Sequence, residues 1–402
     1  MSGPGGTDPP ARWLHELSEN RPAPGLDAVI AGLGAVRSAL APTAERLGIR
    51  RPMVVCGANL ARSPLLGVVL AALGRHVVVY DGSLPHTPWA TVDAGAALAR
   101  RAGIDGLVAL GGSSAVDCAK GIGTLLATGT TSVRDLAPAT FGRLGGTAPA
   151  RLGDPMAVLV VTTTLSFAEF LPFWGALHDE ERRKVPYLDQ GALARTVILD
   201  GEMAATTPDE VWLATGIKAL DDAMFSFCRS DEAEPFGDPV LLAAIRDLVT
   251  WLPASRGPEA VDARHRLLVA TWMTKATLPR LGRASLSGWL STAARHALGG
   301  VYRLPHGVGS CVALGPGLRF HRAATAGRQA TLAGALGWSA APQEAPLGPG
   351  VDTLLAELGL PTRLGSLGVD LDRIDDVVDA IVDESPGLGP TGAIRRACRG
   401  MR

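Results

Sequence analysis

A lysine and an aspartate, Lys218 and Asp222, stand four residues apart in the apolar stretch TGIKALDDAMFSF at residues 215–227. On a helix, this spacing places both side chains on one face. Such a pair is either a surface ion pair that contributes about 0.3–0.5 kcal/mol or part of a buried site. In a site, the ammonium can polarise a carbonyl, hold a carboxylate, or act as acid or nucleophile once its pKa falls.

A glycine-rich turn follows an apolar run in VALGGSSAVDCAK, residues 108–120. Gly111 and Gly112 let the backbone approach a diphosphate closely, and exposed N–H groups at the start of the next helix favour anionic oxygens. Ser113 and Ser114 add hydroxyl donors. The pattern predicts a nucleotide-binding turn, although a plain strand-to-helix connection uses the same glycines.

The elements that must position these residues follow two patterns. In the first half, short β-branched runs alternate with helical patterns, which is typical of parallel βαβ units in a doubly wound sheet. Strands are predicted within 52–57, 76–82 and 157–164, a strand, turn and helix within 105–129, and helices within 26–48, 66–74 and 91–103.

From about residue 208 onward, the apolar periodicity is helical and Gly/Pro loops separate the segments. Helices are predicted within 209–229, 239–253, 258–280, 286–300, 325–337, 351–359, 371–383 and 390–400. The sequence therefore predicts a flexible segment (1–25), an α/β nucleotide-binding domain (26–205) and an all-helical domain (206–402), with the active-site cleft between the two domains.

Composition excludes several classes of protein. The 402-residue chain is 47% hydrophobic, and its 38 basic and 39 acidic residues leave a formal charge of −1. Without a basic stripe, neither nucleic acid nor an anionic membrane is an expected partner. The five cysteines form no CxxC pair, and neither a secretory signal nor a membrane-spanning run stands out, so a cytoplasmic protein is expected.

The turn at 108–120 resembles GGGSxxDxAK, the diphosphate-binding signature of the iron-containing alcohol dehydrogenase family, which includes the maleylacetate reductases. Further segments resemble that family in the same order, over about residues 50–325. These segments are VTTTLSFAEF, HDEERRKVP, RTVILDGEMAATTPDEVWLATGIKALDDA and RHALGGVYRLPHGVGSCVALGPGLRF. The resemblance implies the fold shared with dehydroquinate synthase, and NAD or NADP as cofactor.

The resemblance also implies which residues contact the cofactor. They lie in the glycine-rich turn, in the segment that follows the strand within 157–164, and beside the nicotinamide ribose. These residues are Gly111, Gly112, Ser113, Ser114, Asp117, Thr162, Thr163, Ser166 and Lys184. One departure is Ser113, which replaces the family's third glycine and either donates a hydrogen bond to the diphosphate or occupies its space.

Family members that carry a divalent metal hold it with one carboxylate and three imidazoles. At three of these positions the chain has Lys218, Asp222 and Thr292 instead, and only His306 is kept. An ammonium repels a cation and offers no lone pair. The sequence therefore predicts no metal and suggests that Lys218 takes over the metal's task, with Asp222 beside it.

Two histidines and three further residues complete the predicted site. His296 and His306 flank the turn GGVYRLP, and either can donate a proton during carbonyl reduction, because imidazole titrates near neutrality. The alternative is that an imidazole only ties the turn to a backbone carbonyl. Phe167, Glu169 and Thr292 are the predicted substrate contacts.

The sequence thus predicts a metal-independent, NAD(P)H-dependent reductase or dehydrogenase acting on a small carbonyl or enone compound, and an acidic substrate would fit the cationic Lys218. Natural-product biosynthesis or ring-cleavage metabolism is the expected context, and a homodimer is plausible. A non-redox lyase, cyclase or isomerase on the same scaffold is the main alternative. A catalytically inactive binding protein is a third.

Overall fold

The computed structural model describes residues 11–13, 25–74, 76–136, 152–178, 184–229, 235, 237–276, 288–341 and 344–402. The chain divides into two compact units, with the main boundary between Thr206 and Thr207. One short segment, Thr164–Phe167, groups with the second unit although its neighbours on both sides belong to the first. The predicted N-terminal segment, 1–25, lies mostly outside the described residues.

The first unit contains a seven-stranded sheet in which the edge strand β1 is antiparallel and the other six strands are parallel. In spatial order the strands are β1 (Ala11–Trp13), β2 (Ala28–Ala31), β9 (Thr196–Leu199), β6 (Val158–Thr162), β5 (Gly106–Gly111), β3 (Pro52–Val55) and β4 (Val78–Tyr80). The strands from β2 to β3 are almost entirely apolar and buried, as expected for a parallel sheet covered on both faces.

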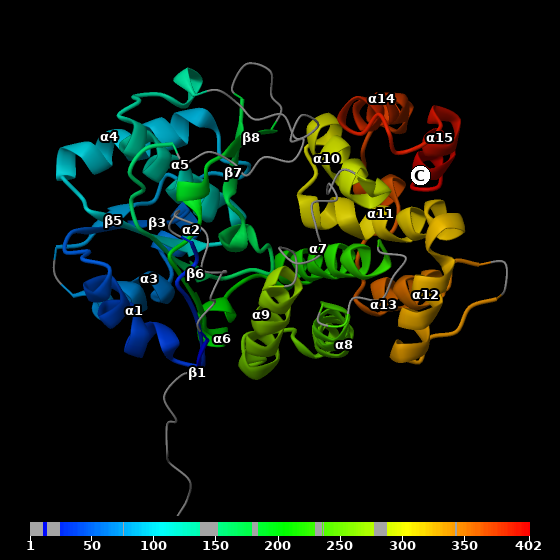
Figure 1. Cartoon of the computed structure of the whole chain (residues 1–402), viewed down its shortest axis with the longest axis horizontal. Helices are drawn as coiled ribbons and strands as arrows, with labels where there is room; N and C mark the ends of the chain where they lie inside the picture. Colours follow the sequence, from blue (N-terminus) through cyan, green and yellow to red (C-terminus); the bar gives the residue numbers. More distant parts are fainter. Residues whose placement is uncertain are drawn as a thin grey trace, which may run out of the picture. The chain divides into compact units, whose positions relative to one another are not determined.

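Helices cover both faces of this sheet, with α1 and α3 on one side and α4 and α5 on the other (Figure 1). Leu40 and Val69 pack against Val54, Val108 and Leu110 in a buried apolar cluster on the first side. The helices of this unit are α1 (Ala35–Arg46), α2 (Ala58–Ala61), α3 (Pro64–Leu73), α4 (Trp89–Ala102), α5 (Ser113–Thr128) and α6 (Gly201–Ala204).

One predicted helix is wrong at its start. The segment 26–48 begins as the strand β2 and becomes helical only at Ala35. Gly32 and Gly34 lie between the two elements with φ angles of 159° and 71°. A short apolar run has the same composition in a buried strand as in a buried helix, so its sequence pattern alone does not separate them.

A two-stranded antiparallel sheet, β7 (Phe173–Leu177) and β8 (Lys184–Leu188), also belongs to the first unit and was not predicted. Trp174 stacks on Tyr187 with ring centroids 4.4 Å apart, and its indole N–H donates to Thr124 on α5. The hairpin follows the 3₁₀ turn Ala168–Phe170, and it places Lys184 near the start of α5.

The second unit is helical in its described residues. Its helices are α7 (Asp209–Cys228), α8 (Gly237–Ala254), α9 (Val261–Ala276), α10 (Leu290–Tyr302), α11 (His306–Phe320), α12 (Arg322–Leu336), α13 (Gly348–Glu357), α14 (Ile374–Glu384) and α15 (Thr391–Arg399). An apolar core joins α10, α11, α14 and α15. Among them, α11 was not predicted as a helix.

These two units confirm the predicted fold class, a doubly wound parallel-sheet domain followed by a helical one. None of the helices in the described part of the chain has the length and apolar character that crossing a membrane requires.

Candidate active site

Lys218 and Asp222 lie on one face of α7, as their spacing predicts, but they are buried rather than exposed. The Lys218 Nζ is 3.7 Å from the Asp222 Oδ2, and the two side chains are 13% and 2% exposed. The surface-pair interpretation is therefore wrong. Removing a carboxylate and an ammonium from water is costly, so the surroundings must stabilise both charges.

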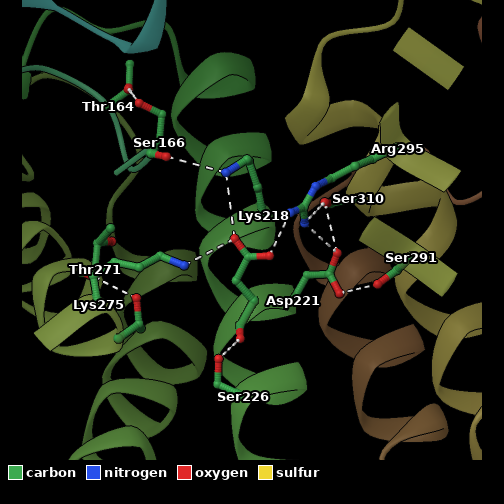
Figure 2. A network of polar contacts seen from close by, with 12 residues as sticks. Thr164, Ser166, Lys218, Asp221, Ser226, Thr271, Lys275, Ser291, Arg295 and Ser310 are labelled. Atoms are coloured by element: carbon green, nitrogen blue, oxygen red, sulfur yellow. Dashed lines mark hydrogen bonds and ion pairs between the residues drawn. The ribbon is translucent and has the colours of Figure 1, made fainter. Parts of the chain in front are cut away.

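Two further cations reach the same carboxylate from neighbouring helices. The Lys275 Nζ, on α9, is 3.5 Å from the Asp222 Oδ2, and the Arg295 Nη2, on α10, is 2.8 Å from the Asp222 Oδ1. Figure 2 shows Lys218, Lys275 and Arg295 converging from three helices. Neither Lys275 nor Arg295 was among the predicted site residues.

The preceding residue, Asp221, is held by a separate set of donors. Its carboxylate accepts hydrogen bonds from Ser291 at 2.5 Å and Ser310 at 3.0 Å, and it forms an ion pair with Arg295 at 3.2 Å (Figure 2). Arg295 thus bridges Asp221 and Asp222. This bridge links α7, α10 and α11 through buried polar contacts.

Burial and neighbouring charges shift the pKa values in the cluster. Burial is the main reason why the pKa of Lys218 lies well below its usual value, and the cations Arg295 and Lys275 lower it further. Burial also lowers the pKa of Lys275. Burial alone would raise the pKa of Asp222, but Arg295, Lys275 and Lys218 together bring it below its usual range. The cluster therefore holds Asp222 ionised and favours loss of a lysine proton.

The ring of Phe167 lies beneath both ammonium groups. The Lys218 Nζ is 3.4 Å and the Lys275 Nζ 3.6 Å from its centroid, within the range of cation–π contacts. Phe167 has a φ of 56°, which is unusual for an aromatic residue and often marks a functional position. Its predicted role as a substrate contact remains a prediction.

Ser166, predicted as a cofactor contact, lies in the same short segment. Its carbonyl oxygen is 3.4 Å from the Lys218 Nζ, and its hydroxyl accepts a hydrogen bond from Thr164 at 3.0 Å. These contacts bring Ser166 together with the catalytic candidate Lys218. The segment Thr164–Phe167 thus contacts the charged cluster and belongs to the same compact unit.

Two glycines of α11 allow the helices around the cluster to pack closely. A Cβ atom on Gly307 would lie 2.7 Å from the backbone of Ala214 on α7, and one on Gly309 would lie 2.9 Å from the Cβ of Arg295. Distances below 3.0 Å exclude a side chain at either position without a shift of the helices. The glycines of the PHGVG sequence therefore help to place Arg295 beside α7.

The two predicted histidines contact each other edge to face, with ring centroids 5.2 Å apart. The Nδ1 of His296 is 2.6 Å from the Glu384 Oε1 on α14, so its partner is a carboxylate rather than a backbone carbonyl. Thr292 is buried one turn before Arg295, and its hydroxyl has no hydrogen-bond partner within the described residues. The catalytic role of His296 and His306 and the substrate role of Thr292 stay predictions.

The predicted nucleotide turn lies in the first unit, between β5 and α5. Gly111 has a φ of 143°, and a Cβ atom there would lie 3.0 Å from the Cβ of Ala115. Gly112 caps α5, which has no side-chain cap on its first turn, so its N–H groups suit an anion. The N–H of Thr163 donates to the Gly111 carbonyl at 3.1 Å, which brings the end of β6, with Thr162, beside the turn.

Four charged residues lie on or beside α5. Asp117 pairs with Lys184 at 2.9 Å, which brings together two predicted cofactor contacts. The fully buried Lys120 donates to the carbonyls of Ala168, Leu171 and Phe173 at 2.7, 2.6 and 3.3 Å. Glu169, predicted as a substrate contact, is buried in the first unit and acts electrostatically on Lys120. Phe167 and Thr292, the other two predicted substrate contacts, belong to the second unit.

A sequence signal for Lys275 does exist. The chain has 38 basic residues but only four lysines, Lys120, Lys184, Lys218 and Lys275. All four are buried or partly buried, and each lies in one of the two clusters just described. In a chain that uses arginine almost everywhere else, the lysine positions stand out, because an ammonium differs from a guanidinium in shape and in how readily its pKa shifts.

Comparison with known proteins identifies the family. Residues 27–201 match the family described as "Iron-containing alcohol dehydrogenase", and residues 212–392 match "Fe-containing alcohol dehydrogenase family, C-terminal". The chain belongs to the iron-containing alcohol dehydrogenase family. This confirms the predicted resemblance and makes the chain an enzyme of a family of NAD(P)-dependent oxidoreductases.

Relatives in this family include dehydrogenases and reductases. The chain is 30% identical to a 4-hydroxybutyrate dehydrogenase of Cupriavidus necator, over 90% of this chain and 93% of that one. It is 29% identical to maleylacetate reductase 1 of Rhodococcus opacus, over 93% and 92%. The crystal structure of a maleylacetate reductase from Agrobacterium tumefaciens superposes with a TM-score of 0.74 at 23% identity, covering 95% and 97%.

The metal positions of this iron-containing alcohol dehydrogenase family member do not suit a divalent cation. The Lys218 ammonium has no lone pair to donate, and Asp222 is already engaged by three cationic side chains. Within the described ranges, no three His, Cys, Asp or Glu residues converge as a metal-binding group. The nucleotide turn, in contrast, retains its close backbone approach and its uncapped helix start, and these features fit a dinucleotide.

Proposed function

We propose that this protein is a metal-independent, NAD(P)H-dependent reductase of a small carbonyl or enone compound. The observation that carries the proposal is the buried ammonium of Lys218, which occupies a position assigned to a metal ligand and is surrounded by Asp222, Lys275 and Arg295. An ammonium in a low-dielectric site stabilises a developing oxyanion by charge and hydrogen bonding, as a Lewis acid does. Family membership supports the redox half of the proposal.

The first unit supplies the residues that would hold the cofactor. Gly111 and Gly112 leave room for the diphosphate, and the N–H groups of Ser113 and Ser114 at the start of α5 would bind its oxygens. A fold neighbour, the sulfoacetaldehyde reductase from Bifidobacterium kashiwanohense, was solved in complex with NAD⁺ (TM-score 0.78, 20% identity, covering 94% and 97%). When bound, NAD(P)H supplies the hydride for the carbonyl carbon.

The residues of the second unit then handle the substrate oxygen. The Lys218 ammonium donates a hydrogen bond to the carbonyl oxygen and transfers a proton from Nζ as negative charge develops there. Its lowered pKa brings proton transfer closer to neutral pH than for an ordinary lysine. Arg295 and Lys275 hold Asp222 in place, and that carboxylate fixes the position of Lys218. His296 and His306 are the proposed source of the replacement proton.

The test combines nucleotide binding with turnover after metal removal. We expect NADH or NADPH fluorescence to report binding, and NAD(P)H oxidation with small aldehydes, ketones and enones to survive dialysis against EDTA and 1,10-phenanthroline. Lys218→Met should slow oxidation about 10³-fold but keep nucleotide binding, whereas Arg399→Met, which removes an exposed charge from α15, should keep both. Failure of both nucleotides to bind at millimolar concentration, or restoration of activity only by a metal, would sink the proposal.

A second candidate function is non-redox lyase, cyclase or isomerase chemistry. The observation that favours it is the burial of Lys218 beside Lys275 and Arg295, which lowers the pKa of its amine, because a neutral amine beside other cations is suited to attack a carbonyl. The amine would add to the carbonyl carbon, and loss of water would leave an iminium ion. Borohydride trapping followed by mass spectrometry of the peptide around Lys218 separates this candidate from a reductase. The metabolic context remains a prediction in either case.

A further inference from the structure

The two lysines of the charged cluster compete for one oxygen atom. Lys218 and Lys275 both approach the Asp222 Oδ2, at 3.7 and 3.5 Å, while the Oδ1 of the same carboxylate is taken by Arg295. Each ammonium carries three N–H donors. Apart from Asp222, the oxygen acceptor recorded near them within the described residues is the Ser166 carbonyl, 3.4 Å from Lys218. The two ammoniums thus have more donors than nearby acceptors.

The cluster also carries more positive than negative charge. With both lysines protonated, Lys218, Lys275 and Arg295 face the carboxylates of Asp221 and Asp222 within the described residues, so three formal positive charges stand against two negative ones. A bound anion favours this protonated state. A buried charge without a counterion costs several kcal/mol. Glu384 also acts on Arg295, but it is 27% exposed and is paired with His296.

The surplus is concentrated at the lysines. Asp221 is paired with Arg295 and accepts hydrogen bonds from Ser291 and Ser310, and its electrostatic effect on the two lysines is smaller than that of Asp222. The two Nζ atoms both lie on the Phe167 ring, 3.4 and 3.6 Å from its centroid, so they are at most 7.0 Å apart (3.4 Å plus 3.6 Å). One small anion can therefore contact both.

We propose that Lys275 binds a substrate carboxylate beside Lys218, and that the substrate of this enzyme is a 2-oxo or 3-oxo acid rather than a neutral carbonyl compound. That such an acid is a substrate rests on the reductase function proposed above, whereas binding of an anion at this site does not. A single surplus charge matches a monoanion such as a carboxylate better than a doubly charged phosphate. Lys218 is the more exposed of the two and faces the reacting carbonyl, while Lys275, 3% exposed, holds the carboxylate.

Two Nζ atoms no more than 7.0 Å apart (3.4 Å plus 3.6 Å) suit a carbonyl and a carboxylate that lie close together on one small molecule. Nitrogens that share one aromatic ring can each bind one of two neighbouring oxygens on the same small molecule. A carboxylate many carbons away from the carbonyl would not reach both. Lys275 is thus assigned as a substrate-binding residue that determines specificity.

The test compares acids with their own uncharged esters. Pyruvate and acetoacetate are titrated into the full-length protein beside methyl pyruvate and methyl acetoacetate, and dissociation constants are measured by ligand-observed NMR. We expect at least one acid to bind about tenfold or more tightly than its ester. In Lys275→Met the ratio of the ester's dissociation constant to that of the acid should fall to about one. In Lys275→Arg and in the surface control Arg399→Met this ratio should stay close to the wild-type value. Circular dichroism melts verify that each variant is folded.

The outcomes separate this inference from the proposed function. Equal binding of acid and ester, no binding of either, or a preference for acid that survives in Lys275→Met overturns the carboxylate subsite. NAD(P)H oxidation with neutral carbonyls only would support the reductase function and contradict the oxo-acid substrate. Lys275-dependent binding of acid without NAD(P)H oxidation would support the carboxylate subsite and contradict the reductase function.

Discussion

Both units of this protein bury lysine ammoniums, but they surround them differently. In the first unit, Lys120 donates to three backbone carbonyls at 2.6–3.3 Å. In the second unit, Lys218 has one carbonyl at 3.4 Å and a carboxylate oxygen at 3.7 Å that it shares with Lys275. Lys120 has its donors satisfied at hydrogen-bonding distance, whereas Lys218 and Lys275 have fewer close acceptors among the residues that the structure describes.

This difference distinguishes a lysine that stabilises the fold from one that is available for chemistry. A buried donor that is fully paired contributes to stability, and its removal leaves acceptors without partners. A buried cation that is incompletely paired costs stability and is retained for function. The comparison assigns Lys120 to the fold, because it anchors the turn at 168–173, and Lys218 to catalysis.

The largest effect is expected for Lys218→Met. If Lys218 stabilises the oxyanion, kcat/KM for carbonyl reduction should fall about 10³-fold, or about 4 kcal/mol. The free energy of unfolding should stay the same or rise, because a buried charge with few partners is removed. NAD(P)H oxidation rates and urea unfolding measure the two quantities. Clear destabilisation with unchanged kcat/KM would reverse the assignment.

Lys120→Met is expected to affect stability rather than catalysis. The loss of its ammonium leaves the carbonyls of Ala168, Leu171 and Phe173 without their donor, and the free energy of unfolding should fall by about 3 kcal/mol. Urea unfolding of this variant beside Lys120→Arg, which keeps donors at the site, measures the effect. A variant as stable as the wild type would mean that these contacts contribute little.

The free energy of unfolding should also depend on pH through the titration of Lys120. Burial lowers the pKa of Lys120 from 10.5 to about 8. Between these two values the unfolded chain binds the proton and the folded chain does not, so the free energy of unfolding should rise with pH in this window. Relative to Lys120→Met, the wild type should gain about 2 kcal/mol from pH 8 to pH 10. Parallel curves for the two proteins would contradict the lowered pKa.

The smallest effect is expected for Lys184→Met. Lys184 pairs one to one with Asp117, and 28% of its side chain is exposed, so the loss of the pair should change stability by less than about 1 kcal/mol. If it contacts the cofactor as predicted, the dissociation constant for NADH or NADPH should rise about tenfold, or about 1.4 kcal/mol. Fluorescence titration measures this change, and an unaltered constant would place Lys184 outside the cofactor site.

Much of the fold was predictable from local patterns. The strands β3, β5 and β6 are continuous apolar runs, and α7 has an unbroken helical period. The pattern failed at 26–48, where an apolar strand precedes the helix, and at α11, whose glycines and Pro316 hide its periodicity. In both places, burial between other elements decides the conformation, and local propensity does not.

Some features of the candidate site were likewise predictable from the sequence, and others were not. The sequence by itself determined that Lys218 and Asp222 share a helix face, because four residues make about one turn. It also determined the order of glycines and helix start in the nucleotide turn, since both lie within one short segment.

Only the tertiary structure decided that Lys275 and Arg295 join Asp222. These residues are 53 and 73 positions further along the chain, counted from Asp222, and they come from α9 and α10. No local pattern relates them to α7. Their convergence depends on how the helices pack, including the close contacts at Gly307 and Gly309. The cluster has its surplus of positive charge because packing brings together charges that are far apart in the sequence.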